Sequence, residues 1–402
     1  GQWVDVSLQR QVESTGLSKI QLKVGELYLP VGKYNRMRWH IREAKVHRGT
    51  KSFSLALPEP EGNYDLDVEF EVYPQESLIL FVAWNPDESI VSEYMFRPKL
   101  VTRKQGMEIK RILAYVTNTD SDALTIIDKQ SDRVVGSIAV GRAPKGVVVN
   151  EQGTKVYVAD SGSKTISVVD TTAGRVIKTI NNFGYSPSVL LLSADEQELY
   201  AVNTDADNVS VINTASEIVS DRIDVGRRPW DIALDGDGNK LYVANRGENT
   251  ISVIDVLTKE VEDTITVELS PSGLAVQDGK VYVANHDSNS ISVIKLGSNT
   301  VSKTIAVGQG PVNVQAGLPG WIYVANENSN DCSFIYTRME MVTQRIAVED
   351  LPRGMGVDTV RRKLYVVNKL SDSVSIIDLA SKKVMAVIQV GRQPHDIAVV
   401  EE

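Results

Sequence analysis

Prolines recur every 40–43 residues through most of the chain, and basic or aromatic side chains cluster beside four of them. The set comprises Arg142, Lys145, Arg227, Arg228, Trp230, Arg353, Arg392 and His395. Guanidinium and ammonium groups that converge on one place bind carboxylate or phosphate oxygens, and an indole face stacks on a cation or a sugar ring. If the fold gathers these side chains, we expect a binding site for an anionic or saccharide ligand, or for an acidic segment of a partner protein.

The same cations have a purely structural alternative. Asp231, Asp350 and Asp396 lie within a few residues of them in the sequence. Ion pairs with these carboxylates would fasten neighbouring parts of the fold without any ligand. The sequence leaves both interpretations open.

Residues that carry common catalytic or metal chemistry are scarce. Four histidines (His40, His47, His286 and His395) are too few for a multi-histidine copper or zinc centre. The single cysteine, Cys332, excludes an internal disulfide, a cysteine metal site and covalently attached haem. Gly-x-Ser-x-Gly, His-Glu-x-x-His and phosphate-binding glycine motifs are absent. We therefore expect no catalysis, no cofactor and no metal; a hydrolase or lactonase whose residues scatter over several repeats is the alternative.

A Tyr-Val-x-Asn/Asp motif, repeated seven times, predicts the elements that would position these residues. Its tyrosines are spaced 42, 43, 42, 40, 41 and 42 residues apart, at Tyr115, Tyr157, Tyr200, Tyr242, Tyr282, Tyr323 and Tyr365. Each period reads as four short strands rich in Val, Ile and Tyr, bounded by Gly, Asp, Asn and Ser. Four antiparallel strands per about 40–45 residues are typical of a β-propeller blade. We predict an all-β chain with a seven-bladed β-propeller over residues 112–402.

The two ends of the repeat region predict how the ring closes. The first repeat starts directly at its second strand, residues 112–118, and the chain ends in a first strand, Asp396 to Val400, that has no second strand after it. The two fragments add up to one blade, so we expect the C-terminal strand to be the innermost strand of the first blade. Such closure removes the open sheet edges that a partial ring would expose. In this geometry the residues beside the repeat prolines surround the mouth of the central channel.

The repeat resembles the YVTN family of propeller repeats, known from archaeal surface-layer proteins and bacterial secreted proteins. The resemblance covers the seven Tyr-Val-x-Asn copies, third strands such as Ser375 to Asp378, and Val-Gly-x-x-Pro turns at Val140–Pro144, Val225–Pro229, Val307–Pro311 and Val390–Pro394. It implies an extracellular or periplasmic location and a binding or structural role.

The first 98 residues contain no repeat. Alternating apolar residues predict strands at Trp3–Leu8, Ile20–Leu29, Arg36–Val46, Ser52–Leu57, Leu66–Tyr73, Leu78–Trp84 and Ser92–Phe96. About seven short strands in 100 residues favour an immunoglobulin-like β-sandwich over residues 1–98, although no family is identified there. The polar, basic residues 99–111 are expected to form a linker.

Charge and composition narrow the function further. A net charge of −9 gives no reason to bind nucleic acid, and no apolar run is long enough to cross a bilayer. A start at Gly1 is what removal of an export signal would leave. We predict a non-catalytic secreted, cell-surface or periplasmic module, whose propeller presents an interaction face and whose N-terminal domain tethers it to a protein or cell-surface component. A subunit of a larger envelope or redox assembly is a further alternative.

Overall fold

The computed structural model of the protein describes residues 29–48, 51–57, 62–73, 80–85, 89–92, 95–96, 98–104, 113–181 and 185–400. Every element in these residues is a β-strand, as predicted. The chain divides into two compact units, Gly1–Met107 and Glu108–Glu402, which we describe separately.

The first unit contains eight described strands that pair two by two. They are β1 (Gly32–His40), β2 (Ala44–Arg48), β3 (Lys51–Leu55), β4 (Asn63–Val72), β5 (Leu80–Asn85), β6 (Ile90–Ser92), β7 (Met95–Phe96) and β8 (Lys99–Lys104). The antiparallel pairs are β1–β4, β2–β3, β5–β8 and β6–β7. Leu66, Val68 and Phe70 alternate along β4 and form the buried centre of the unit.

Two expectations for this unit differ from the structure. The strand predicted over Arg36–Val46 is interrupted between β1 and β2, where the Ile41 amide donates to the Gly62 carbonyl at 2.9 Å. Residues 99–104, which we expected in a linker, instead form β8, because Leu100 packs against the apolar cluster centred on β4. The predicted strand Trp3–Leu8 and most of Ile20–Leu29 lie outside the described residues, and the β-sandwich stays a prediction.

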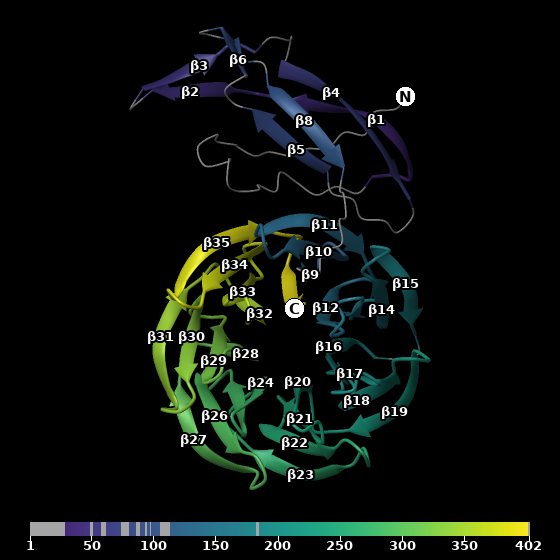
Figure 1. Cartoon of the computed structure of the whole chain (residues 1–402), viewed down its shortest axis with the longest axis vertical. Helices are drawn as coiled ribbons and strands as arrows, with labels where there is room; N and C mark the ends of the chain where they lie inside the picture. The colour runs from purple at the N-terminus through teal and green to yellow at the C-terminus, as the bar shows by residue number, and fades with distance from the viewer. Residues whose placement is uncertain are drawn as a thin grey trace. The chain divides into compact units, whose positions relative to one another are not determined.

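The second unit is a seven-bladed β-propeller, which confirms the predicted fold (Figure 1). Each blade is an antiparallel sheet of four strands. The first, innermost strands are β12 (Pro144–Val149), β16 (Pro187–Leu192), β20 (Pro229–Leu234), β24 (Pro271–Gln277), β28 (Pro311–Ala316), β32 (Pro352–Asp358) and β36 (Pro394–Val399). The second strands are β9 (Leu113–Asn118), β13 (Lys155–Asp160), β17 (Glu198–Asn203), β21 (Lys240–Asn245), β25 (Lys280–Asn285), β29 (Trp321–Asn326) and β33 (Lys363–Asn368).

The outer half of each blade consists of the third and fourth strands. The third strands are β10 (Ala123–Asp128), β14 (Thr165–Asp170), β18 (Asn208–Asn213), β22 (Thr250–Asp255), β26 (Ser290–Lys295), β30 (Asp331–Tyr336) and β34 (Ser373–Asp378). The fourth strands are β11 (Arg133–Ala139), β15 (Arg175–Ile180), β19 (Ile218–Asp224), β23 (Val261–Thr266), β27 (Thr300–Ala306), β31 (Met341–Ala347) and β35 (Lys383–Gln389). We number the blades in ring order: blade 1 is β36-β9-β10-β11, blades 2 to 6 follow in chain order, and blade 7 is β32 to β35.

The C-terminal strand closes the ring as predicted. Strand β36 pairs antiparallel with β9, with Pro394 opposite Asn118 and Ala398 opposite Tyr115. Next to this junction, Lys129 of blade 1 donates to the Val400 carbonyl and pairs with Asp358 of blade 7 at 2.9 Å. The side chains of Lys129 and Asp358 are 1% and 2% exposed, so this ion pair fastens the closure from inside the protein.

The repeated motif has a packing function in every blade. Its tyrosine is at most 3% exposed because each second strand lies inside its blade and between two other blades. Its asparagine ends the second strand and, in six blades, donates through Nδ2 to a Ser or Thr of the third strand at 2.9 Å. In blade 2 the position is Asp160, which instead accepts from Ser167 Oγ at 2.6 Å.

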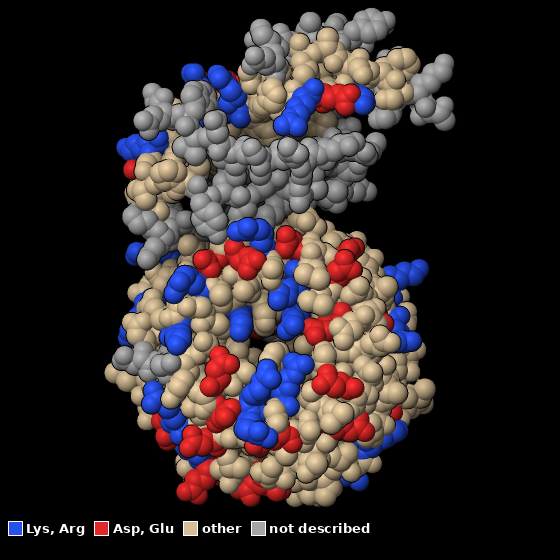
Figure 2. Space-filling view, turned by 180° about the vertical axis from the view of Figure 1, so that it is seen from behind, with Lys and Arg blue, Asp and Glu red and all other residues tan. Residues whose placement is uncertain are grey.

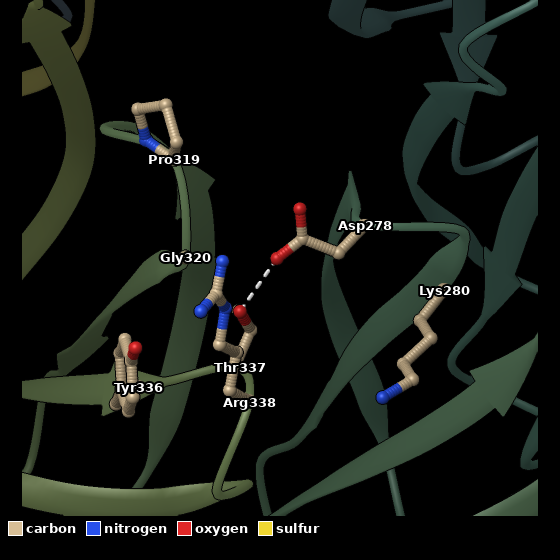
Figure 3. A pocket seen from close by; sticks show the side chains of 7 residues that line it. All are labelled: Asp278, Lys280, Pro319, Gly320, Tyr336, Thr337 and Arg338. Carbon is tan, nitrogen blue, oxygen red and sulfur yellow. Dashed lines mark hydrogen bonds between the residues drawn. The ribbon is translucent and has the colours of Figure 1, made fainter.

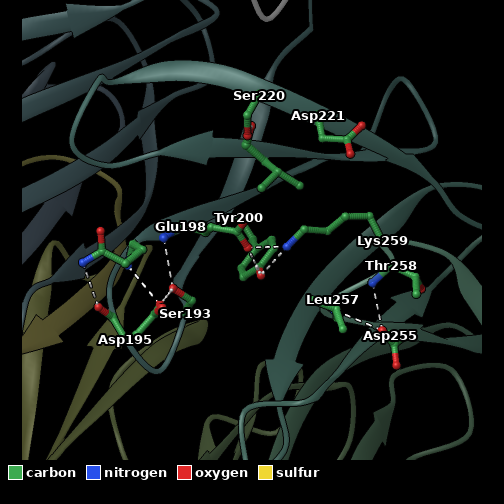
Figure 4. Close-up of polar contacts among 12 residues, drawn as sticks. Ser193, Asp195, Glu198, Tyr200, Ser220, Asp221, Asp255, Leu257, Thr258 and Lys259 are labelled. Carbon is green, nitrogen blue, oxygen red and sulfur yellow. Dashed lines mark hydrogen bonds and ion pairs between the residues drawn. The ribbon is translucent and has the colours of Figure 1, made fainter.

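Blades also contact one another away from the channel. Lys259 of blade 4 pairs with Glu198 of blade 3, and its Nζ lies 3.3 Å from the hydroxyl of Tyr200 (Figure 4). Tyr200 donates that hydroxyl to Glu198 at 2.6 Å. Such polar contacts join the blades, and the buried apolar clusters between sheets supply the rest of the packing.

Candidate functional site

Two residues from each blade surround one mouth of the central channel. The repeat proline pairs with the asparagine that ends the second strand, for example Pro187 with Asn203, and a register shift follows it. The residue after each proline therefore lies beside the residue after each asparagine; Ser188 Oγ and Thr204 Oγ1 are 3.0 Å apart. We call this double ring the channel mouth: Lys145, Ser188, Trp230, Ser272, Val312, Arg353 and His395 with Thr119, Ser161, Thr204, Arg246, His286, Glu327 and Lys369.

Basic residues gather on blades 7, 1 and 2 of the channel mouth. Figure 2 shows Lys and Arg side chains around the central opening on this face of the propeller. Arg353 and Lys369 come from blade 7, His395 from blade 1 and Lys145 from blade 2. Burial and the charge of Arg353 lower the pKa of both lysines, although Asp205 acts in the opposite direction on Lys145. Within the described residues, neither lysine ammonium has a hydrogen-bond or ion-pair partner.

One carboxylate of the channel mouth, Glu327 of blade 6, lies between His286 of blade 5 and Arg353 of blade 7. It is 3.0 Å from Arg353 Nη2 and 2.9 Å from His286 Nε2, and its side chain is 11% exposed. Burial opposes ionisation, but the hydrogen bond with His286 and the charge of Arg353 hold the pKa of Glu327 below its ordinary value. His286, in turn, has a raised pKa because Glu327 and Asp287 both bond to its ring. Glu327 is thus shared between His286 and Arg353 and bonds to neither lysine, although its charge and that of Asp120 act on Lys369 from a distance.

The opposite side of the channel mouth carries an aromatic platform. The guanidinium of Arg246 lies 4.5 Å from the ring centroid of Trp230, a cation–π contact within blade 4. Burial lowers the pKa of Arg246, and the charge of Arg353 acts in the same direction, so the two guanidinium groups share one electrostatic environment.

The other predicted cations lie outside the channel mouth, on exposed turns. Arg142 donates to the Gly162 carbonyl at 3.3 Å, and Arg392 donates to the Asp120 carbonyl at 2.8 Å. Arg227 pairs with Glu248 at 3.1 Å, and its side chain is 70% exposed. Arg228 is also exposed. The structure therefore brings together four of the eight candidates, Lys145, Trp230, Arg353 and His395.

The carboxylates considered as structural partners have other roles. Asp231 accepts the Leu274 amide at 2.8 Å and Asp396 accepts the Val147 amide at 3.2 Å, so each joins its first strand to that of the next blade. Burial raises the pKa of Asp231 to about 7 and that of Asp396 to about 6. Asp350 accepts from the Asn330 amide at 2.9 Å. The structural alternative predicted that these three aspartates pair with the arginines. Arg227 pairs with Glu248 instead, and Arg353 pairs with Glu327.

Four residues of the channel mouth escaped the sequence reasoning: Arg246, His286, Glu327 and Lys369. Each directly follows the asparagine of the repeated motif. The position of these residues in the repeat could have identified them. The motif asparagine pairs with the repeat proline, so the residue after the asparagine lies on the same face of the ring as the residue after the proline.

A separate cavity of 380 Å³ lies between blades 5 and 6 at the turns between first and second strands (Figure 3). It is lined by Asp278, Lys280, Pro319, Gly320, Tyr336, Thr337 and Arg338. Thr337 donates to Asp278 at 2.6 Å, and Lys280 pairs with Glu340 at 2.7 Å. Three of its polar side chains are therefore already paired, which makes this cavity a weaker candidate than the channel mouth.

Two features of the described residues bear on other functions. No cluster of three or more His, Cys, Asp or Glu side chains suited to a metal occurs among them. Nor does that part of the chain contain a helix with the length and apolar character needed to span a membrane.

Comparisons with known proteins agree on the fold. Residues 188–349 match the family model of the YNCE-like beta-propellers. No curated protein sequence matches the chain. The YVTN surface-layer assignment stays a prediction.

Solved structures with a similar fold include proteins of different kinds. Hydrazine synthase of Kuenenia stuttgartiensis has a TM-score of 0.60 at 16% identity, over 66% of this chain and 92% of that one. A functionally unknown protein from Desulfotomaculum acetoxidans DSM 771 has a TM-score of 0.65 at 14% identity, over 72% and 99%. The dihydro-heme d1 dehydrogenase NirN in complex with DHE has a TM-score of 0.57 at 14% identity, over 72% and 76%. At these identities the similarity establishes a shared propeller fold and nothing about activity.

Proposed function

We propose that this protein is a non-catalytic binding module whose propeller takes an anionic group of a ligand or partner at the channel mouth. The observation that supports this most strongly is the charge imbalance there. Arg353 and Lys369 come from blade 7 and Lys145 from blade 2, and Glu327, a carboxylate of blade 6, is shared between Arg353 and His286.

The energetics of the channel mouth favour an anion. Partial burial removes water from the ammonium groups, and their mutual repulsion adds to that cost, which is why the pKa values of Lys145 and Lys369 are lowered. An oxyanion would return the missing negative charge and accept hydrogen bonds from Lys145, Lys369 and Arg353. Trp230 with Arg246 would contact a flat or saccharide portion of the same ligand.

The cellular setting belongs to the same proposal. The repeat resemblance supports a secreted, cell-surface or periplasmic location, with the N-terminal unit tethering the propeller to an envelope component or to a larger assembly. Fractionation of native cells, with mass spectrometry of the N-terminus and of copurifying proteins, tests this; an intact cytosolic N-terminus would overturn it.

Calorimetric titration of the full chain with sulfate and with phosphate tests the anion site. Loss of one hydrogen bond to a charged group costs about 1.5–3 kcal/mol. We therefore expect Arg353→Ala and Lys145→Ala each to weaken binding by about ten- to a hundredfold. Arg227→Ala is the matched control, because it removes an exposed cation outside the channel mouth, and binding should be unchanged. Absence of saturable binding, or equal binding by Arg353→Ala, would overturn the proposal. Turnover of an ester or lactone that Arg353→Ala abolishes would instead identify a hydrolase.

A further inference from the structure

His395 occupies a singular place in the channel mouth. It follows Pro394 at the start of β36, so its side chain lies between blades 7 and 2 at the point where the ring closes. Its Nδ1 is buried and has no hydrogen-bond partner among the described residues. The proposed function uses the lysines and the arginine beside it but gives this imidazole no role.

The charges that act directly on His395 are basic. Lys145 acts on it from blade 2, and Arg353 and Lys369 act on it from blade 7. Asp396, the next residue of β36, accepts hydrogen bonds from the backbone amides of Val147 in blade 2 and of Ile397. The other carboxylates act on the neighbouring lysines: Asp120 and Glu327 on Lys369, and Asp205 on Lys145.

This surrounding keeps the imidazole neutral in the free protein. Burial, and then the charges of Arg353, Lys145 and Lys369, hold the pKa of His395 well below its ordinary value of 6.5. A neutral imidazole donates from only one nitrogen, whereas a protonated one donates from both. A bound anion offsets the positive charge of these neighbours, and the protonated ring then gains an attractive partner.

We infer that anion binding at the channel mouth is coupled to uptake of a proton by His395, so that the ligand binds more tightly as the pH falls. The inference rests on the proposed anion site and adds its regulation. Binding that takes up one proton tightens by up to about tenfold per pH unit between the pKa values of the free and bound states. A protein with this property would capture its anion in acidic surroundings and release it as the pH rises.

Sulfate is the appropriate probe, because it keeps its charge across the pH range of histidine titration whereas phosphate does not. Calorimetric titrations at one pH in two buffers with different heats of ionisation give the number of protons taken up. For the wild-type chain we expect close to one proton near pH 6, and tighter binding at pH 5 than at pH 7.

His395→Gln keeps a polar side chain without a titrating ring, and it should bind sulfate with no proton uptake near pH 6. His286→Gln is the control, because His286 is the other imidazole of the channel mouth; uptake should persist. Uptake by Lys145 or Lys369 would appear at higher pH and survive in His395→Gln. Sulfate binding without proton uptake, or with uptake unchanged in His395→Gln, refutes the inference and leaves the anion site intact, whereas absence of sulfate binding refutes both.

A second measurement works without that variant, should it fail to fold. The chain has four histidines, so their ring resonances in NMR can be assigned by single substitutions of the other three. Sulfate should raise the titration midpoint of the His395 ring. An unchanged midpoint in the presence of bound sulfate contradicts the inference.

Discussion

Asp160→Asn is expected to stabilise the propeller. Asp160 is fully buried at the position that six other blades fill with asparagine. Blade 4 shows what the substitution would create, because Asn245 there donates to Thr250 at 3.1 Å and to Ser252 at 2.9 Å. Thr165 and Ser167 occupy the matching positions beside Asp160, at 3.4 and 2.6 Å. The amide would therefore find acceptors already in place.

The expected gain depends on pH. Burial raises the pKa of Asp160 from 3.8 to about 7, against the hydrogen bonds from Ser167 and Thr165. Between these values the folded state holds a proton that the unfolded state releases, so the free energy of unfolding of the wild type falls as the pH rises. At about 1.4 kcal/mol per pKa unit, the penalty reaches roughly 2 kcal/mol at pH 5 and roughly 4 kcal/mol at pH 8, as an upper bound. Asparagine carries no such penalty.

Denaturant or thermal unfolding of the propeller at pH 5 and pH 8 measures the effect. Asp160→Asn should raise the midpoint at both values, and more at pH 8. Asn245→Asp should do the reverse in blade 4, with the largest loss at pH 8. Asp237→Asn is a control for net charge, since Asp237 is exposed in a turn, and it should change little.

The reasoning fails if Asp160→Asn raises stability equally at pH 5 and pH 8, because the gain would then have no connection with ionisation. It also fails if Asn245→Asp costs nothing at pH 8. Asp231 and Asp396, with pKa values of about 7 and about 6, titrate in the same range, so the wild-type profile should keep part of its slope after the substitution.

The closure of the ring is open to two further tests. Lys129→Ala removes the most buried partner of Asp358, which keeps Arg361 at 3.4 Å, and should cost about 3 kcal/mol of unfolding free energy. Lys240→Ala, which breaks a partly exposed pair with Asp255, should cost under about 1 kcal/mol. Equal costs in denaturant titrations would contradict the burial argument. Deleting residues 394–402 removes β36 and leaves β9 as an open sheet edge, so the midpoint of thermal unfolding should fall markedly. Adding a peptide of the deleted sequence should restore part of the midpoint. An unchanged midpoint in the truncated chain would disprove the closure.

The propeller was predictable because its signals are local and repeated. The tyrosine of the motif and the asparagine, or in blade 2 Asp160, are buried for the same reason in all seven blades, so each copy supports the interpretation of the others. The missing first strand of blade 1 and the surplus strand at the C-terminus added the long-range information. The first unit has no repeat to provide this support. In that unit, β8 has the sequence Lys-Leu-Val-Thr-Arg-Lys, and its Leu100 packs against the apolar cluster. Its three basic residues made the segment resemble a linker.

The site was predicted only in part, because residues at similar positions in the repeat point in different directions, and residues far apart in the sequence meet between blades. Arg142 and Arg392 stand two residues before a proline and were counted with the channel mouth, but the turn directs them outward to carbonyls of a neighbouring turn. Glu327 was missed because its partners, His286 and Arg353, belong to the blades on either side of it. Contacts between blades leave no short motif in the sequence.

The residues after the motif asparagine show which part of the channel mouth the fold itself requires. In blades 1 and 2 this position holds Thr119 and Ser161, and each donates its hydroxyl to the proline carbonyl of the next blade. Blades 4 to 7 carry Arg246, His286, Glu327 and Lys369 at the same position instead. A hydroxyl there joins two blades at no electrostatic cost, so packing alone gives no reason for a partly buried cation such as Lys369, whose pKa is lowered by its surroundings. His286 and Glu327 have partners in neighbouring blades, but Lys369 carries its charge where blades 1 and 2 work with a hydroxyl, and the proposed anion would give it the partner it lacks among the described residues.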